Sequence, residues 1–120
     1  MKELYEDVAF VVYPVSDILR SKAFFSGVLE LTETADWGEW VEYDIGHGTL
    51  AITNTYSHLK PGANGAILAI EVSDIDKMHE ALKRKIVNLV TEAFDMPGCK
   101  NISIKDPDGN KLILHQRKDK

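Results

Sequence analysis

The chain has 120 residues, enough for one domain with a single hydrophobic core. Hydrophobic residues make up 44% and charged residues 28%, and the formal net charge of -5 argues against a general affinity for nucleic acid or anionic membranes. No apolar run reaches the roughly 20 residues that span a bilayer. The start of the chain contains acidic residues, which a secretory leader lacks. Cys99 is the single cysteine, which excludes an internal disulfide. We therefore expect a cytoplasmic protein with no nucleic-acid or membrane partner.

The first half of the chain predicts one strand, one helix and three further strands. Val8–Val15 is apolar and β-branched, which is typical of a buried strand. Ser16 or Asp17 then caps a helix, because short polar side chains accept hydrogen bonds from the first free amides. The helix has an apolar stripe, and three short strands follow it at Thr32–Ala35, Trp40–Ile45 and Thr49–Thr53.

The second half predicts the same order of elements after a linker at about 56–65. A strand is expected at Ala66–Val72 and a helix at Ile75–Lys85. Three more strands are expected near Leu89–Ala93, Asn101–Ile104 and Lys111–Gln116.

A short repeat links the two halves. Val15-Ser16-Asp17-Ile18 recurs 57 residues later as Val72-Ser73-Asp74-Ile75, each time between a predicted strand and a predicted helix. We therefore predict an α+β fold in which two tandem βαβββ modules, at about 7–55 and 66–116, form one domain over residues 1–120. Its strands should make a curled mixed sheet, and the concave side of that sheet is where a ligand would bind.

Three stretches resemble the vicinal oxygen chelate superfamily, which includes glyoxalase I, ring-cleaving dioxygenases and bleomycin-resistance proteins. They are Ser16–Leu31, Ala69–Asp76 and the turn Ile104–Leu112, which contains Asp-Pro-Asp-Gly-Asn. Glu30 departs from the pattern, because the superfamily usually has glycine there. By itself the Asp-Pro-Asp-Gly-Asn sequence specifies a tight turn. The resemblance therefore indicates the fold, and the chemistry has to be argued from other residues.

The resemblance implies four metal-ligand positions, one on the first and one on the last strand of each module. In this chain they fall on Phe10, Ala51, Ile67 and Ile113, all apolar. None of these side chains can donate a lone pair to a divalent cation, so we predict no metal ion and no other cofactor.

Polar residues on the same strands are candidates for a rebuilt site. His115 lies two residues beyond Ile113, Glu71 four beyond Ile67 and Thr53 two beyond Ala51, so strand alternation points each pair the same way. His115 and Glu71 would act as an acid/base pair, hold a metal weakly or orient a ligand. The alternative is that His115 ends a strand near solvent and that Glu71 pairs with a nearby cation.

Aromatic residues supply the other candidate surface. Trp37, Trp40 and Tyr43 lie close together in the first module, and Phe10 occupies one of the four ligand positions. Such rings can stack on a planar ligand, or they can belong to the core or to a dimer contact.

Three functions are consistent with these residues. The first is a metal-independent protein that binds a small organic molecule in an apolar, aromatic-lined cup. The second is an enzyme, a glyoxalase-like lyase or isomerase with an unconventional metal or acid/base site. The third is a structural or regulatory module whose cup is filled by its own side chains. The resemblance also implies a homodimer. The predicted ligand-binding residues are Phe10, Trp37, Trp40, Tyr43, Ala51, Thr53, Ile67, Glu71, Ile113 and His115.

Overall fold

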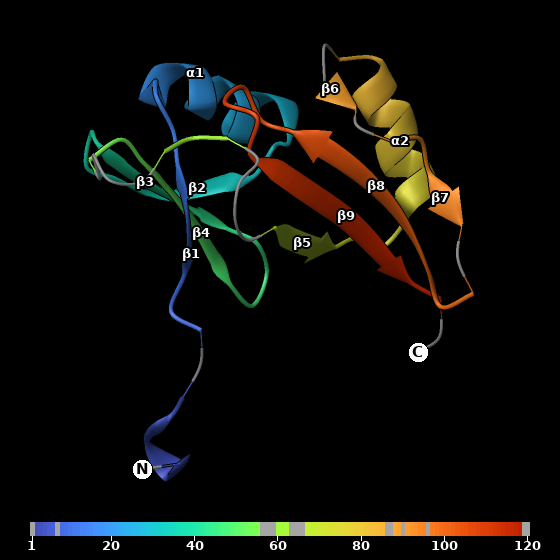
Figure 1. Cartoon of the computed structure of the whole chain (residues 1–120), viewed down its shortest axis with the longest axis horizontal. Coiled ribbons are helices and arrows are strands. Elements are labelled where there is room, and N and C mark those ends of the chain that lie inside the picture. Colours follow the sequence, from blue (N-terminus) through green and yellow to red (C-terminus); the bar gives the residue numbers. More distant parts are fainter. Residues whose placement is uncertain are drawn as a thin grey trace.

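The computed structural model describes residues 2–6, 8–55, 60–62, 67–85, 88–89, 91–95 and 97–118. After a 3₁₀ turn (Lys2–Leu4), the first module consists of β1 (Val11–Pro14), α1 (Ile18–Lys22) continuing as a π-helix (Ala23–Val28), β2 (Thr32–Asp36), β3 (Trp40–Asp44) and β4 (Thr49–Thr53). The second consists of β5 (Leu68–Glu71), α2 (Ile75–Lys83), β6 (Asn88–Leu89), β7 (Phe94–Asp95), β8 (Cys99–Lys105) and β9 (Lys111–Arg117). The predicted α+β fold of tandem βαβββ modules is confirmed (Figure 1).

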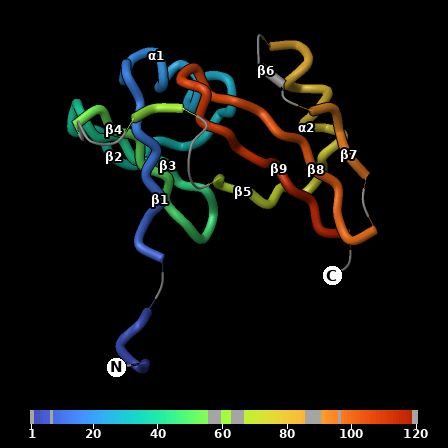
Figure 2. Tube along the Cα trace, viewed as in Figure 1, coloured from blue at the N-terminus to red at the C-terminus, as the bar shows by residue number. Residues whose placement is uncertain are grey.

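The strands form two mixed sheets. The first has the order β1-β4-β3-β2 and the second β5-β9-β8-β6, with β7 also paired to β8. In each sheet the first and last strands of the module pair in parallel, β1 with β4 and β5 with β9, and the other pairs are antiparallel. Helix α1 contacts β4, and α2 contacts β8 and β9. The 3₁₀ turn at the start of the chain lies away from both sheets, as Figure 2 shows.

The repeated tetrapeptide works as a helix start in both modules. The carboxylate of Asp17 accepts a hydrogen bond from the backbone amide of Arg20 (3.1 Å), and the carboxylate of Asp74 accepts one from the amide of Lys77 (3.0 Å). Each aspartate thereby satisfies an amide that has no partner within its helix. Of the two caps expected for α1, Asp17 is the one that the structure uses.

The strand predicted near Leu89–Ala93 is wrong in its extent. The chain forms two short strands there, β6 and β7, and Thr91 lies between them. The hydroxyl of Thr91 accepts a hydrogen bond from the backbone amide of Ser103 (3.1 Å). A side chain therefore takes the place of a backbone carbonyl in the ladder with β8, and the strand is interrupted. Most of the predicted linker at 56–65 and the first residue of the predicted strand at Ala66 lie outside the described residues.

One buried cluster lies between the sheets and the helices and contains residues of both modules. Alternate residues of the long strands point into it, as strand geometry requires. Its members are Tyr13, Val15, Phe24, Phe25, Val41, Tyr43, Leu50, Ile52, Ile75, Leu82, Ile102, Ile104, Leu112 and Leu114. Neither helix in the described residues is long and apolar enough to cross a membrane.

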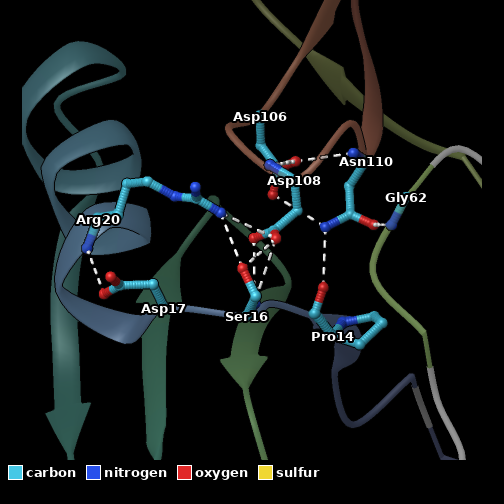
Figure 3. Close-up of polar contacts among 8 residues, drawn as sticks. All are labelled: Pro14, Ser16, Asp17, Arg20, Gly62, Asp106, Asp108 and Asn110. Atoms are coloured by element: carbon cyan, nitrogen blue, oxygen red, sulfur yellow. Dashed lines mark hydrogen bonds and ion pairs between the residues drawn. The ribbon is translucent and has the colours of Figure 1, made fainter.

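The two modules are joined by the turn between β8 and β9 (Figure 3). Asp108, whose side chain is only 5% exposed, accepts hydrogen bonds from the amide of Ser16 (3.2 Å), the hydroxyl of Ser16 (2.6 Å) and the guanidinium of Arg20 (3.0 Å). The side-chain amide of Asn110 donates to the carbonyl of Pro14 (2.9 Å). The second module thus holds the segment that leads from β1 into α1.

Asp106 shapes this turn from inside. One of its carboxylate oxygens accepts hydrogen bonds from the backbone amides of Asp108 (3.0 Å) and Asn110 (2.7 Å). The carboxylate is 3% exposed, and this burial raises the pKa of Asp106 although the bonds from Asn110 oppose the shift. The turn is therefore stabilised by hydrogen bonds of its own side chains, in addition to its contacts with the first module.

Glu30 has a backbone conformation that suits glycine. Its φ is +58°, in the left-handed region, and it comes directly after Leu29, the C-cap of the π-helix. This explains why the superfamily pattern has glycine here. The ammonium of Lys85 lies 3.1 Å from the Glu30 carboxylate and also donates to the carbonyl of Val28, so a contact with the second module accompanies the strained backbone.

We expect Asp108→Asn to destabilise the protein by about 1–3 kcal/mol, because the amide cannot accept every donor that the buried carboxylate accepts. Denaturant unfolding monitored by circular dichroism measures the change. Asp95→Asn is the matched control, since Asp95 forms an exposed ion pair with Lys118 and its loss should have little effect. Equal effects of the two substitutions would contradict the role assigned to Asp108.

A second prediction concerns Glu30. Both Glu30→Gly and Glu30→Ala lose the ion pair to Lys85, but only glycine adopts positive φ without strain. The glycine variant should therefore be more stable than the alanine variant by about 1 kcal/mol. Thermal melting of the two variants side by side tests this, and an alanine variant as stable as the glycine variant would show that the turn is unstrained.

Candidate functional site

Each sheet has one face packed on the core and one face turned away from it. In the first sheet Val41 and Leu50 point into the core, so Trp40, Glu42 and Ala51 point to the opposite face. In the second sheet Leu112 and Leu114 point into the core, so Ile113 and His115 point away. We call these outward surfaces the open faces, and they are where the candidate site residues lie.

Side chains of the chain itself cover the open face of the first sheet. The rings of Phe10 and Trp40 meet edge to face with centroids 5.4 Å apart, and the indole N–H of Trp40 donates to Glu42 (2.9 Å). Phe10 precedes β1 and Trp40 begins β3, with β4 between them in the sheet, so their contact passes over β4. Ala51 on β4 has no exposed surface. The aromatic pair is thus a lid of two rings beside a carboxylate.

Two of the predicted ligand-binding residues are not part of this aromatic pair. Tyr43 is fully buried in the core, where it stacks beside Phe25 and shares a hydrogen bond with Ser26 (2.9 Å), and burial raises the pKa of its phenol. It faces away from Trp40 because the two are three residues apart on one strand. Trp37 is 68% exposed in the turn between β2 and β3. Tyr43 therefore does not line an open face, and we leave both residues out of the proposed lining.

Thr53 is on the open face but its hydroxyl is already used. It donates to the carbonyl of Glu39 (2.7 Å) and shares a second hydrogen bond with the hydroxyl of Thr55 (2.9 Å). Since Thr53 is also fully buried, it shapes the sheet and offers no group to a ligand.

The open face of the second sheet brings His115 and Glu71 together, as strand alternation suggested. The two residues are direct partners in the β5–β9 register, and Nδ1 of His115 lies 2.6 Å from Oε1 of Glu71. The other carboxylate oxygen of Glu71 accepts a hydrogen bond from the backbone amide of Arg117 (2.7 Å). Nδ1 is thus held by a carboxylate, while Nε2 of His115 has no hydrogen-bond partner among the described residues, and the side chain is 32% exposed.

The four positions expected for metal ligands do not fit a metal ion. Ala51 is paired with Val12, and Ile113 is paired with Ala69, which lies 57 residues after Val12, so the two modules use the same register. Phe10 is 44% exposed and Ile67 46% exposed, and both carry only hydrocarbon. In the part of the chain that the structure describes, no three His, Cys, Asp or Glu side chains are grouped so as to hold a metal ion.

A family model described as the Glyoxalase/Bleomycin resistance protein/Dioxygenase superfamily matches residues 8–114. The chain belongs to this superfamily. The match extends from before β1 to the middle of β9, so it covers most of both modules and ends one residue before His115. A search of curated proteins found no match to the chain.

Several solved structures share the whole fold. TnmS3, an antibiotic binding protein from Streptomyces sp. CB03234, is 21% identical, with a TM-score of 0.84 and coverage of 95% of this chain and 98% of that one. A superfamily member from Sphaerobacter thermophilus is 20% identical, with a TM-score of 0.80 and coverage of 95% and 99%. A virulence protein from Salmonella typhimurium is 21% identical, with a TM-score of 0.78 and coverage of 95% and 98%. At these identities the likeness establishes the fold.

The sequence analysis missed several polar residues of the open faces. Glu42 beside Trp40, and Asn101, Ser103, Lys105 and Lys111 on the second sheet, point the same way as the predicted residues. For the four residues on β8 and β9, the signal is in the sequence: pairing these strands outward from the turn, together with strand alternation, places them on the open face.

A shallow open depression lies apart from both faces, along the first turns of α2. Its lining is charged and of mixed sign, from Asp74, Asp76, Lys77, Glu80 and Arg84. Asp74 is already the helix cap and Asp76 pairs with Lys100 (3.1 Å), so we assign these groups to the solvated side of the helix.

Proposed function

We propose that this protein binds a small organic molecule on its open faces without the help of a metal ion. The observation that carries the proposal is the Glu71–His115 pair on the open face, two residues along β9 from the apolar Ile113. A carboxylate that fixes one ring nitrogen leaves the other to bond a polar group of a ligand. The apolar neighbours then bury the ligand body.

The aromatic pair supports the same function. Phe10 and Trp40 offer ring edges and faces to a planar compound, and Glu42 lies beside them. One relative of the same fold is named as an antibiotic binding protein, which places small-molecule binding within the range of this fold. The proposed lining is Phe10, Trp40, Ile67, Glu71, Ile113 and His115.

The same pair of residues supports an enzyme as the second candidate. A histidine held by a carboxylate has the arrangement of a general base, since the carboxylate stabilises the charged imidazole that forms when a proton is taken. The reaction would be a proton transfer of the lyase or isomerase type, with His115 at the reacting atom and Glu71 positioning it. The third candidate is a structural or regulatory protein whose cup is filled by its own side chains. The covered face of the first sheet favours this candidate, but only for the first module.

We further propose that the protein acts as a cytoplasmic homodimer. Ile67 and Phe94 are 46% and 55% exposed at opposite sides of the second sheet, and a second copy of the chain would bury such apolar surface.

The tryptophans give a direct test of ligand binding. The chain has two, so Trp37→Phe leaves Trp40 as the sole reporter on the open face. Planar apolar compounds, such as naphthalene and anthraquinone derivatives, should change the emission of this variant in a saturable way, because they stack near the indole. Trp40→Phe, which keeps only the turn residue Trp37, should not respond. A broad panel without effect on Trp37→Phe would contradict the proposal.

Metal independence is tested on untagged wild-type protein. We expect no stoichiometric metal by elemental analysis and no rise in melting temperature with nickel, zinc, manganese or iron(II), because the four positions of the usual site are apolar. A metal-specific rise that His115→Ala abolishes would instead support the enzyme candidate. His79→Ala is the matched control, since His79 pairs with Glu92 away from both open faces.

A further inference from the structure

We propose that the open face of the second sheet contains an anion subsite formed by Lys105, Lys111 and Ser103, and that the ligand is therefore a planar compound with a carboxylate, sulfonate or phosphate group. This inference rests on the proposed function for the ligand body. The subsite itself has a separate observable, the effect of inorganic phosphate on the melting temperature.

The two lysines are direct cross-strand partners. Lys105 ends β8, Lys111 begins β9, and they face each other in the ladder at the base of the Asp106–Asn110 turn. Ile104 and Leu112, their neighbours on the chain, are fully buried in the core, so both lysines point to the open face. Directly opposite residues have Cβ atoms only about 5 Å apart, and like charges at that distance repel each other.

The repulsion is not relieved inside the chain. Asp and Glu outnumber Lys and Arg by 19 to 14, and carboxylates pair with Arg20, Lys22, Lys83, Lys85, Lys100 and Lys118. Within the described residues, neither Lys105 nor Lys111 has a carboxylate within ion-pair distance. Two lysines that face each other across the ladder without a carboxylate partner, in a chain with a surplus of carboxylates, point to an anion supplied from outside.

Ser103 completes a polar triangle. It lies two residues before Lys105 on β8, on the same face, and is paired with Ile113 in the next row of the ladder. The backbone of Ser103 is bonded to Thr91, whereas its hydroxyl has no hydrogen-bond partner among the described residues. A bound anionic group would thus meet two ammonium groups and one hydroxyl donor, with Ile113 beside it for the apolar part of the ligand.

The position suits a ligand that also uses the rest of the site. Lys111 is next to the junction of the modules, since its carbonyl accepts a hydrogen bond from the phenol of Tyr13 (2.7 Å) on β1. His115 lies four residues further along the same strand on the same face. An anionic group at the lysines therefore extends a ligand along β9 toward the Glu71–His115 pair.

A matched pair of dyes tests the proposal. 8-Anilinonaphthalene-1-sulfonate and N-phenyl-1-naphthylamine share one ring system, and only the first has a negative charge. In low salt, wild-type protein should bind the sulfonate about tenfold more tightly than the neutral dye, and added salt should reduce that preference. The double substitution Lys105→Met and Lys111→Met should weaken the sulfonate to the level of the neutral dye and leave the neutral dye unchanged.

Controls separate charge from fold. Lys77→Met removes a lysine of α2, away from the open faces, and should leave both dyes unaffected. The double arginine variant should keep the preference for the sulfonate. If the double methionine variant binds the sulfonate as wild type does, or if wild type binds both dyes equally, the anion subsite is refuted while small-molecule binding stands.

A measurement without dye distinguishes failure of the subsite from failure of the proposed function. Inorganic phosphate, compared with chloride at equal ionic strength, should raise the melting temperature of wild type and not that of the double methionine variant, because it relieves the repulsion between the two lysines. If neither dye binds but phosphate has this effect, the subsite exists and the apolar cup does not. The absence of a phosphate effect in wild type refutes the subsite.

Discussion

The carboxylate of Asp108 is the contact on which the arrangement of the two modules depends. It is nearly buried and accepts hydrogen bonds from both polar groups of Ser16 and from Arg20, at the point where β1 passes into α1. A charged acceptor with three donors is among the stronger polar contacts a protein makes, and the loss of any donor would leave charge without compensation. Asn110 adds a bond to Pro14 from the same turn. The turn therefore fixes the end of β1 beside the start of β9, and with it the relation between the two open faces.

The two modules keep one framework and use it differently. Both cap their helix with an aspartate, and both pair the first and last strand in the same register. In the first module Phe10 and Trp40 lie over β4, and Ala51 beneath has no exposed surface. In the second module the equivalent face has Glu71 and His115 in contact. The paired strands share one register, and the side chains on them differ: the first module closes its face with rings, and the second leaves polar groups at the surface.

The sequence was sufficient for the fold and for part of the site. The repeat, the caps and the alternation of apolar residues predicted nearly every element, and the match of His115 with Glu71 followed from counting along strands. Tyr43 was misplaced because clustering with Trp40 in sequence was given more weight than strand alternation, which puts the two on opposite faces. The break between β6 and β7 depends on the hydroxyl of Thr91 meeting Ser103, a contact between distant residues that no local pattern contains. Lys105 and Lys111 were not predicted for a related reason. Lysines that flank a turn are usually solvated, and only the strand pairing shows that these two face each other.

The apolar residues at the four usual ligand positions change what recognition on this fold must depend on. A metal ion supplies a concentrated charge that binds an anionic or polarised oxygen wherever the pocket places it. Without that charge, an apolar surface gives affinity in proportion to the buried area but little orientation. Direction must then come from fixed polar groups, and on the second sheet these are Nε2 of His115, oriented by Glu71, and the ammonium groups near the turn. Both sets project from β8 and β9, whose connecting turn is tied to the first module by Asp108. The contact that joins the modules therefore also holds in place the charges that a ligand without a metal would require.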